Sequence, residues 1–350
     1  MVLPTANKAA VIQDQGPSFS LTIASVPLPP LPPSSVLVRM IASGLCGTDL
    51  SICLGAFGPT QPTPGHEGIG RIISIGSAVN AHECPPNTLV GIGFIRDACS
   101  FCTGCRRDET RCTLRAMAGV NIPGCLAEYA IVPARYVTRV PDSVPPEILA
   151  PVMCAGVTAY KALRVAGLRA GHTVVLTGGG GGLGQMGVQY AKAMGVRVVV
   201  VDAGPEKGAA VLRLGAEAYV DFLKEDVVER VRELTGGEMA AAVLVMAGNI
   251  PAYNQAMDLV GMYGTVVCVG ICKPGDKMGV DPKLMIDNGI RILGSMVGGR
   301  QDIKEAMDFV KQGRVKPAVR VVGVSDINSV MQEMKAGTLT EKVVVELDFE

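Results

Sequence analysis

The chain has 350 residues, of which 48% are apolar and 18% are charged. This length suffices for two domains with separate cores, and the composition is typical of a globular chain and excludes a disordered one. The 32 basic and 32 acidic side chains give a formal net charge of zero, so no nucleic-acid partner and no membrane-surface partner is expected.

The cysteines and the N-terminal sequence indicate a reducing compartment. No segment reaches the ~18 consecutive apolar residues that a membrane helix needs, and residues 1–15 lack the apolar region of a signal peptide. The cysteines number 11, and an odd count argues against a simple disulfide framework. We therefore expect a cytoplasmic protein whose cysteines are thiols or metal ligands.

Residues 1–155 predict a β-rich domain. Short apolar runs such as 35–43 and 70–79 alternate with turn-forming stretches, of which the proline-rich segment 27–35 is one. Strand-like sequence returns near the end of the chain, at 316–324 and 341–349. We expect this tail to rejoin the first domain.

From residue 172 onward, strands alternate with helices. The predicted strands are 173–178, 197–202, 218–222, 241–248, 264–270 and 291–297. The predicted helices are 182–195, 205–215, 224–234, 250–260 and 301–313. Apolar strands between helices indicate a parallel sheet that is covered on both faces. We predict an α/β fold with a doubly wound (Rossmann) cofactor domain, 156–293, and a β-rich domain, 1–155 with 294–350.

A glycine-rich loop follows the first strand of the predicted sheet. Gly179, Gly181 and Gly184 satisfy the spacing G-x-G-x-x-G, and Gly182 and Leu183 stand within it. This spacing allows a tight turn and a close approach of the backbone to a diphosphate at the helix N-terminus. A five-glycine run also suits a flexible turn, but its place between a strand and a helix favours dinucleotide binding.

Asp202 ends the next predicted strand, and Lys207 follows five residues later. A carboxylate at this position can accept hydrogen bonds from ribose hydroxyls and would repel a 2′-phosphate. We therefore expect NAD(H) rather than NADP(H) as the cofactor, with both residues in contact with it.

Four cysteines are clustered between residues 99 and 112. Cys99, Cys102, Cys105 and Cys112 are separated by two, two and six residues, which suits closed tetrahedral zinc coordination. The alternatives are four free thiols or an iron–sulfur cluster, although ferredoxin cysteines are spaced differently. A closed site leaves no position for a substrate, so we interpret the cluster as a structural zinc site.

A second possible metal site is scattered along the chain. His66 stands twenty residues after Cys46, and Cys154 lies immediately before the predicted cofactor domain. Two cysteines and a histidine are a known ligand set for a zinc ion that keeps its fourth position open. From the spacing alone, a buried histidine and two core cysteines are the commoner explanation for these residues.

The strings GLCGTDL, GHEG, CAGVTAYKAL and GGLGQMGVQYAKAMG, in this order around the four-cysteine loop, resemble the zinc-dependent medium-chain alcohol dehydrogenases. The yeast-type members are the most similar, and the resemblance covers essentially the whole chain. It implies a GroES-like catalytic domain beside the Rossmann domain. It also implies hydride transfer between NAD(H) and a small-molecule alcohol, primary or secondary, or the corresponding aldehyde or ketone.

The same resemblance implies two zinc ions per subunit. Cys46, His66 and Cys154 would hold the catalytic zinc, with Glu67 beside it and Asp49 orienting the ligands. The four-cysteine loop would hold the structural zinc.

Further roles follow from the resemblance. Thr48 would hydrogen-bond the substrate oxygen, and Ser51 stands where many relatives carry a proton-relaying histidine. A serine can pass a proton along a chain but cannot hold one near neutral pH. The remaining cofactor contacts would be Thr158, Val269, Val297 and Lys342, the last in place of the usual arginine.

The substrate pocket and the assembly are also predicted by comparison with that family. Yeast-type enzymes narrow the pocket with tryptophans, whereas this chain has none and carries Phe94 at one such place and Cys53 or Phe57 near the other. We expect a substrate bulkier than ethanol. We also expect a homotetramer or homodimer whose subunits meet at the edge strand 291–297.

Two other functions remain open at this point. One is reduction of an activated double bond or quinone within the same superfamily, whose members commonly lack both zinc sites. The other is a non-catalytic, NAD-responsive regulatory protein that keeps zinc for stability alone.

Overall fold

The computed structural model describes residues 4–339 and 341–349. The chain divides into two compact units. Unit 1 takes its described residues from Met1–Cys154, Gly299–Lys311 and Pro317–Glu350, and unit 2 consists of Ala155–Gly298 and Gln312–Lys316. Residues 294–298, assigned above to the β-rich domain, therefore fall in unit 2.

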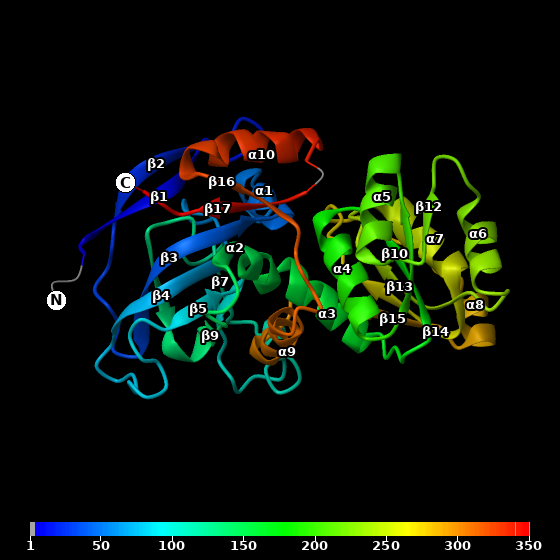
Figure 1. Ribbon diagram of the computed structural model, residues 1–350, viewed down its shortest axis with the longest axis horizontal. Coiled ribbons are helices and arrows are strands. Elements are labelled where there is room, and N and C mark those ends of the chain that lie inside the picture. The colour runs from blue at the N-terminus through cyan, green and yellow to red at the C-terminus, as the bar shows by residue number, and fades with distance from the viewer. Residues whose placement is uncertain (1–3, 340, 350) are drawn as a thin grey trace. The chain divides into compact units, whose positions relative to one another are not determined.

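Unit 2 is built on a six-stranded parallel sheet with the order β12-β11-β10-β13-β14-β15 (Figure 1). The strands are β10 (Thr173–Thr177), β11 (Arg197–Asp202), β12 (Ala218–Asp221), β13 (Ala240–Val245), β14 (Val260–Cys268) and β15 (Arg291–Gly294). The chain moves outward from β10 in one direction and, from β13 onward, in the other. This doubly wound order confirms the predicted fold class. Ligands of such sheets bind where the strand order reverses, which here is at the carboxyl ends of β10 and β13.

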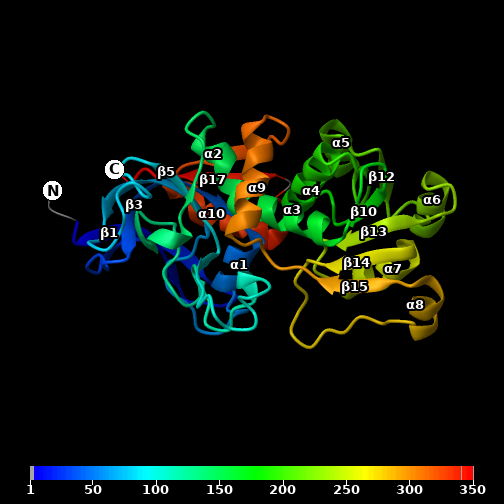
Figure 2. The same cartoon turned by 90° about the horizontal axis from the view of Figure 1, so that it is seen from below.

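Helices follow the strands of unit 2, and Figure 2 shows α7 and α8 beside β14 and β15. The helices are α3 (Ala155–Val165), α4 (Gly182–Ala193), α5 (Pro205–Leu214), α6 (Val227–Leu234), α7 (Ile250–Leu259) and α8 (Pro282–Asn288). The sequence analysis did not predict α8. This helix begins at the capping side chain of Asp281 and buries none of its residues, so it has no apolar periodicity to find.

Unit 1 contains a seven-stranded sheet, in which the order β16-β17-β3-β4-β5-β9 is extended by β8 on β3, and two small sheets, β1-β2 and β6-β7. The strands are β1 (Ala6–Gln13), β2 (Ser20–Pro27), β3 (Ser35–Leu45), β4 (Glu67–Ile75), β5 (Leu89–Ile92), β6 (Ile95–Asp97), β7 (Ala116–Met117), β8 (Tyr129–Pro133), β9 (Thr138–Arg139), β16 (Val319–Val322) and β17 (Lys342–Glu346). The tail strand β17 pairs antiparallel with β3.

The helical elements of unit 1 are short. They are α1 (Gly47–Cys53), α2 (Pro146–Leu149), α9 (Arg300–Lys311), α10 (Ile327–Ala336) and the 3-10 turns η1 (Glu109–Arg111), η2 (Ala134–Tyr136), η3 (Ala150–Met153) and η4 (Val324–Asp326). The strand-like prediction for the tail omitted α10. That helix buries Ile327, Val330 and Met331, which have helical spacing, and it ends at Gly337 in the left-handed conformation.

No single helix among the described residues is long and apolar enough to cross a membrane. In the part of the chain that the structure describes, one bent pair, Pro146–Met153 and Ala155–Val165, reaches the necessary length and composition together.

Candidate active site and metal centres

The ends of two strands and of one 3-10 turn bring the scattered metal ligands of unit 1 together. The register pairs Gly44 of β3 with Glu67 of β4, so Cys46, just after β3, and His66, just before β4, lie at the same edge of the sheet. Cys154 directly follows η3. The ligand atoms of Cys46, His66, Glu67 and Cys154 all lie within 4.8 Å of one another.

His66 is completely buried, and its two ring nitrogens have different surroundings. Nδ1 lies 2.8 Å from Oδ1 of Asp49, while Nε2 is buried without a hydrogen-bond partner among the described residues. A proton on Nδ1 donated to Asp49 leaves the Nε2 lone pair free for a metal ion. Burial alone lowers the pKa of His66, but the Asp49 carboxylate raises it well above its usual range.

Asp49 is itself held by the backbone. Its Oδ2 accepts from the N–H of Cys46 at 3.1 Å, and its Oδ1 accepts from the N–H of Gly65 at 3.0 Å. Gly65 has a φ of +102°, and a Cβ there would lie 2.6 Å from the backbone nitrogen of Leu126. Only glycine fits this turn, which places His66 at the start of β4.

The two thiols of this site interact directly. A hydrogen bond with Cys154 lowers the pKa of Cys46, and the charge of Lys342 lowers it further. The same hydrogen bond raises the pKa of Cys154. Two thiolates and an imidazole suit a zinc ion with an open fourth position.

Glu67 completes the cluster through an ion pair that the sequence analysis did not find. Its Oε1 lies 2.7 Å from Nζ of Lys342, which also donates to the carbonyl of Leu45 at 2.8 Å. Burial raises the pKa of Glu67 to about 8, although Lys342 opposes the shift. Its Oε2 has no partner among the described residues, and a Cβ at Gly44 would lie 1.9 Å from that oxygen.

The other residues expected around the catalytic zinc lie in α1 or shortly after it, except Phe94. Thr48 is half-buried in the first turn of α1, and Ser51 Oγ donates to the carbonyl of Gly47 at 2.9 Å. The ring of Phe94 meets the His66 ring edge-on, with centroids 5.4 Å apart. Cys53 is buried, whereas Phe57 is exposed.

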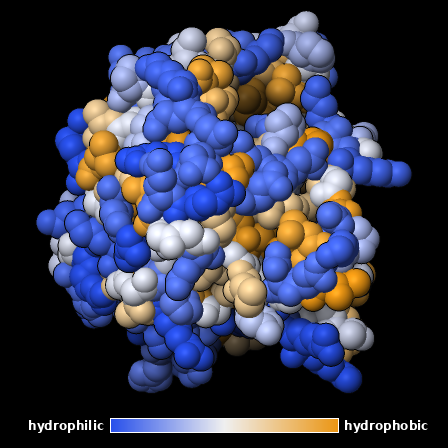
Figure 3. All heavy atoms as spheres, turned by 90° about the vertical axis from the view of Figure 1, so that its right-hand side faces the viewer, coloured by the Kyte–Doolittle hydropathy of each residue, from blue (hydrophilic) through white to orange (hydrophobic). Residues whose placement is uncertain are grey.

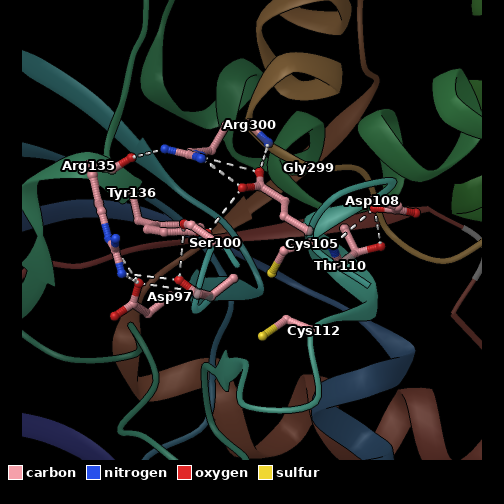
Figure 4. A network of polar contacts seen from close by, with 12 residues as sticks. Asp97, Ser100, Cys105, Asp108, Thr110, Cys112, Arg135, Tyr136, Gly299 and Arg300 are labelled. Atoms are coloured by element: carbon pink, nitrogen blue, oxygen red, sulfur yellow. Dashed lines mark hydrogen bonds and ion pairs between the residues drawn. The ribbon is translucent and has the colours of Figure 1, made fainter. Parts of the chain in front are cut away.

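The four clustered cysteines form a second possible metal centre in unit 1. Their sulfur atoms all lie within 4.8 Å of one another, and Cys99 and Cys105 are 3.9 Å apart. This agrees with the ~3.8 Å expected between sulfurs at ~2.3 Å from a tetrahedral zinc ion. A backbone N–H bond from Cys105 lowers the pKa of Cys102 to about 6, and one from Cys99 lowers that of Cys112. Figure 4 shows Cys105 and Cys112 in this loop.

The glycine loop of unit 2 links β10 to α4. A Cβ at Gly179 would lie 2.7 Å from Cγ1 of Val200, and one at Gly184 would lie 2.3 Å from Cα of Gly179. A Cβ at Gly181 would meet nothing closer than 3.7 Å. The first and third glycines thus allow internal packing, while the second borders open space at the first turn of α4, which includes Gly182 and Leu183.

Asp202 stands at the carboxyl end of β11, beside this loop. Its Oδ2 accepts from the N–H of Gly180 at 2.9 Å, and its Oδ1 lies 2.9 Å from Nζ of Lys207. The carboxylate is therefore oriented before any ribose arrives.

The other expected cofactor contacts are divided between the units. Thr158 lies in α3, Val269 follows β14, and Val297 lies in the segment after β15, all in unit 2. Val269 N–H bonds to the carbonyl of Val245 at 3.2 Å, which fixes the loop after β14 on its neighbouring strand. Lys342 belongs to unit 1, where Glu67 and Leu45 occupy its ammonium group.

Known proteins match this chain over nearly its full length. The family model for the alcohol dehydrogenase GroES-like domain matches residues 32–142, and that for the zinc-binding dehydrogenase matches residues 182–312. An alcohol dehydrogenase of Geobacillus stearothermophilus is 38% identical over 97% of this chain and 99% of its own. Alcohol dehydrogenase 1 of Emericella nidulans is 36% identical over 99% of both chains.

Solved structures agree with these matches. Acetophenone reductase of Geotrichum candidum, in complex with NAD, has a TM-score of 0.86 at 27% identity and covers 100% of this chain and 99% of its own. The alcohol dehydrogenase of Aeropyrum pernix has a TM-score of 0.86 at 28% identity, with 97% of this chain and 99% of its own covered.

The fold, the two ligand clusters and these matches define a zinc- and nicotinamide-dependent oxidoreductase of alcohols and carbonyl compounds. The chain belongs to the zinc-dependent medium-chain alcohol dehydrogenases.

Proposed function

We propose that this enzyme interconverts an alcohol bulkier than ethanol with its aldehyde or ketone, using NAD(H) in preference to NADP(H). Cys46, His66 and Cys154 hold the catalytic zinc, and the loop of Cys99, Cys102, Cys105 and Cys112 holds a structural one. The observation that carries the proposal is the buried Nε2 of His66, which faces two thiols and has no hydrogen-bond partner among the described residues.

Bound zinc supplies a Lewis acid, which lowers the pKa of a hydroxyl group and polarises a carbonyl group. The protein keeps the ligand set in place. Asp49 accepts a hydrogen bond from the Nδ1–H group of His66. This hydrogen bond favours the tautomer whose Nε2 lone pair is free to act as a ligand. Lys342 holds the Glu67 carboxylate by one oxygen and leaves the other facing the ligands.

Thr48 and Ser51 are the two hydroxyl groups proposed to lie on the path of the substrate proton. The half-buried Thr48 hydroxyl accepts the proton of the substrate hydroxyl in a hydrogen bond. The hydroxyl of Ser51 is engaged as a donor to Gly47, so it offers only its lone pairs. Neither hydroxyl stores a proton near neutral pH, so the proton must continue to water or to the cofactor ribose.

Unit 2 binds the cofactor. The first turn of α4, with Gly181, Gly182 and Leu183, offers backbone N–H groups to the diphosphate. Asp202 accepts from the ribose hydroxyls and repels a 2′-phosphate, and Lys207 lies beside it. Thr158, Val269 and Val297 form the nicotinamide side of the site. Lys342 is the remaining expected cofactor contact, and its ammonium group pairs with Glu67 in this structure.

The subunits assemble, in this proposal, as a homodimer or homotetramer through the edge strand β15. Exposed apolar side chains occur on neighbouring segments of unit 2, where Met262, Tyr263, Ile271 and Ile286 are each at least 66% exposed. Figure 3 shows apolar atoms gathered at several places on a mostly hydrophilic face. Burial of such side chains and pairing of the strand edge both favour association. We place the protein in the cytoplasm, where its thiols stay reduced.

Nicotinamide absorbance tests the proposal. A panel of short, long and aromatic alcohols, with their aldehydes and ketones, is run in both directions with NAD(H) and NADP(H). We expect higher kcat/KM for the bulkier alcohols and for NAD. Turnover of ethanol that equals or exceeds turnover of the larger alcohols would contradict the substrate proposal. Light scattering on the protein eluted from a size-exclusion column measures the mass of the assembly. A monomeric mass would contradict the proposed homodimer or homotetramer.

A further inference from the structure

The four-cysteine loop is joined to the start of helix α9 by a set of polar contacts, which Figure 4 shows from close by. We call this set the α9 polar network and define it as Asp97, Glu109, Arg135, Tyr136 and Arg300. All five residues belong to unit 1. None of them was singled out by the sequence analysis, and none is one of the four clustered cysteines.

Glu109 is the centre of the α9 polar network. Its Oε1 accepts from the backbone N–H of Arg300 at 2.7 Å, and its Oε2 lies 2.9 Å from Nη2 and 3.0 Å from Nε of the same residue. The hydroxyl of Tyr136 donates to Oε2 at 3.1 Å. Burial raises the pKa of Glu109, but the hydrogen bonds from Arg300 outweigh it and the pKa is lowered.

Arg300 is also linked to the other end of the loop, through Arg135. Its Cζ lies 4.6 Å from the centroid of the Tyr136 ring, and its Nη1 donates to the carbonyl of Arg135 at 3.0 Å. Arg135 in turn donates to Asp97 from Nε at 3.1 Å and from Nη2 at 2.6 Å. Asp97 stands two residues before Cys99, and Glu109 stands three residues before Cys112. Arg300 therefore contacts Glu109, near one end of the four-cysteine segment, directly. It is linked to Asp97, near the other end, through Arg135.

The α9 polar network lies where the chain passes from unit 2 into unit 1. Unit 2 ends at Gly298, unit 1 resumes at Gly299, and α9 begins at Arg300. A carboxylate at a helix N-terminus is stabilised by the free N–H groups and by the helix dipole. A Cβ at Gly299 would lie 2.9 Å from Oε1 of Glu109, so a glycine here lets the carboxylate approach.

We propose that Arg300 is a positioning residue that couples the four-cysteine site to the N-terminus of α9. Zinc in the loop fixes Glu109 so that it holds Arg300, and Arg300 in turn keeps the loop in the form that retains zinc. Such coupling is reciprocal, because metal affinity and folding of a metal-binding loop are linked. The inference rests on the proposed structural zinc site, but not on the proposed substrate.

Zinc retention tests one direction of the coupling. The holoenzyme is incubated with a chelator, and loss of the loop's zinc is followed by alkylation of the peptide that carries the four cysteines. We expect Arg300→Met to expose these thiols about tenfold faster than the unaltered enzyme, because a charge-assisted, partly buried pair is lost. Arg300→Lys should restore part of the protection, since it keeps the charge but not the fork or the stacking.

The matched control is Arg320→Met. Arg320 forms an ion pair of similar length with Glu333 in unit 1, with Nη2 and Oε2 2.8 Å apart, but it touches no part of the loop in the contacts described. We expect this variant to keep zinc at the unaltered rate. We also expect the double variant Glu109→Gln with Arg300→Met to release zinc no faster than Arg300→Met alone, because the same interaction is removed.

Hydrogen exchange tests the other direction. Removal of the loop's zinc should speed amide exchange at the start of α9 in the unaltered enzyme, whereas Arg300→Met should already show fast exchange with zinc bound. Equal thiol exposure in Arg300→Met and Arg320→Met, or an α9 whose exchange ignores zinc, would overturn the coupling. A purified enzyme without zinc in the loop would overturn the structural-site assignment together with it, and metal analysis before the experiment separates these results.

Discussion

At the residue scale, the catalytic cluster depends on the absence of a side chain at Gly44. A Cβ there would lie 1.9 Å from Oε2 of Glu67, inside a buried strand. We expect Gly44→Ala to lower the free energy of unfolding by about 1–3 kcal/mol, because Glu67 must move while Lys342 holds its other oxygen. Urea unfolding measures the change.

Gly47→Ala is the matched control for this substitution. A Cβ at Gly47 meets nothing within 4 Å, and the residue begins α1. We expect its unfolding free energy to stay within about 0.5 kcal/mol of the unaltered value. Equal destabilisation by the two substitutions would show that Glu67 does not occupy the space beside Gly44.

Asp49 sets the tautomer of His66, which gives a second prediction. In Asp49→Asn the amide keeps the size of the side chain, but it can present an N–H group to Nδ1 and so favour the wrong tautomer. We expect zinc affinity at the catalytic site, and kcat/KM with it, to fall about 10–100-fold. Chelator competition measures the affinity. Asp142→Asn, which alters an exposed pair with Arg71, should have no effect.

The pH dependence of stability can be tested far from both metal sites. Hydrogen bonds from Arg197 lower the pKa of Glu217, at distances of 2.8 and 2.6 Å. The pair therefore stabilises the fold above the ordinary carboxyl pKa of about 4.3, and this contribution is lost as the pH falls through the lowered value. Both side chains are half exposed, so Glu217→Gln should cost about 0.5 kcal/mol at pH 7.

Urea unfolding from pH 7 to pH 3.5 measures this difference. We expect the gap between Glu217→Gln and the unaltered enzyme to close on acidification. A gap that widens at low pH would contradict the assigned sign.

Some residues could be identified from the sequence and others could not. The motif strings pointed to Cys46, His66 and Cys154, whose ligand atoms the fold brings together. The pair of Glu67 with Lys342 was not predicted, because 275 positions separate the two residues. They meet because β3 pairs with β17 on one side and with β4 on the other.

At the scale of elements, the turn between β10 and α4 separates packing from binding. Gly184→Ala would drive a Cβ to 2.3 Å from the backbone of Gly179, whereas Gly181→Ala meets no protein atom closer than 3.7 Å. We expect Gly184→Ala to cost about 1–3 kcal/mol of stability, and Gly181→Ala less than about 1 kcal/mol. Gly181→Ala should nevertheless weaken NAD binding about tenfold, because its methyl group borders the diphosphate position.

Urea unfolding and a fluorescence titration with NADH separate these two effects. NAD affinity that is unchanged in Gly181→Ala would contradict the binding position at the first turn of α4.

Elements with strong apolar patterns were predictable. Strands β10, β11 and β13 are almost completely buried and read as continuous apolar runs, so they were found close to their observed positions. Helix α8 was missed because it buries no residue, and α10 because strand-like runs flank it. The α9 polar network was missed for a different reason, since Glu109 and Arg300 are far apart in the sequence and meet only in the folded chain.

At the scale of the whole molecule, two ligand clusters divide the work. The clustered cysteines are close in sequence, whereas Cys46, His66, Glu67 and Cys154 come from distant segments. In the proposed function the first cluster is a closed zinc site, and the second leaves a position for a substrate. Function therefore depends on the whole fold of unit 1, and binding of the nicotinamide cofactor on the glycine loop of unit 2.

Zinc analysis combined with an alcohol oxidation assay tests the central claim, that Cys46, His66 and Cys154 form the catalytic zinc site. We expect two zinc ions per chain and NADH formation in the unaltered enzyme. In Cys154→Ser we expect one zinc ion, retained by the four cysteines, and a loss of NADH formation with the fold intact by circular dichroism. One zinc ion in the unaltered enzyme, or full activity in Cys154→Ser, would contradict the account.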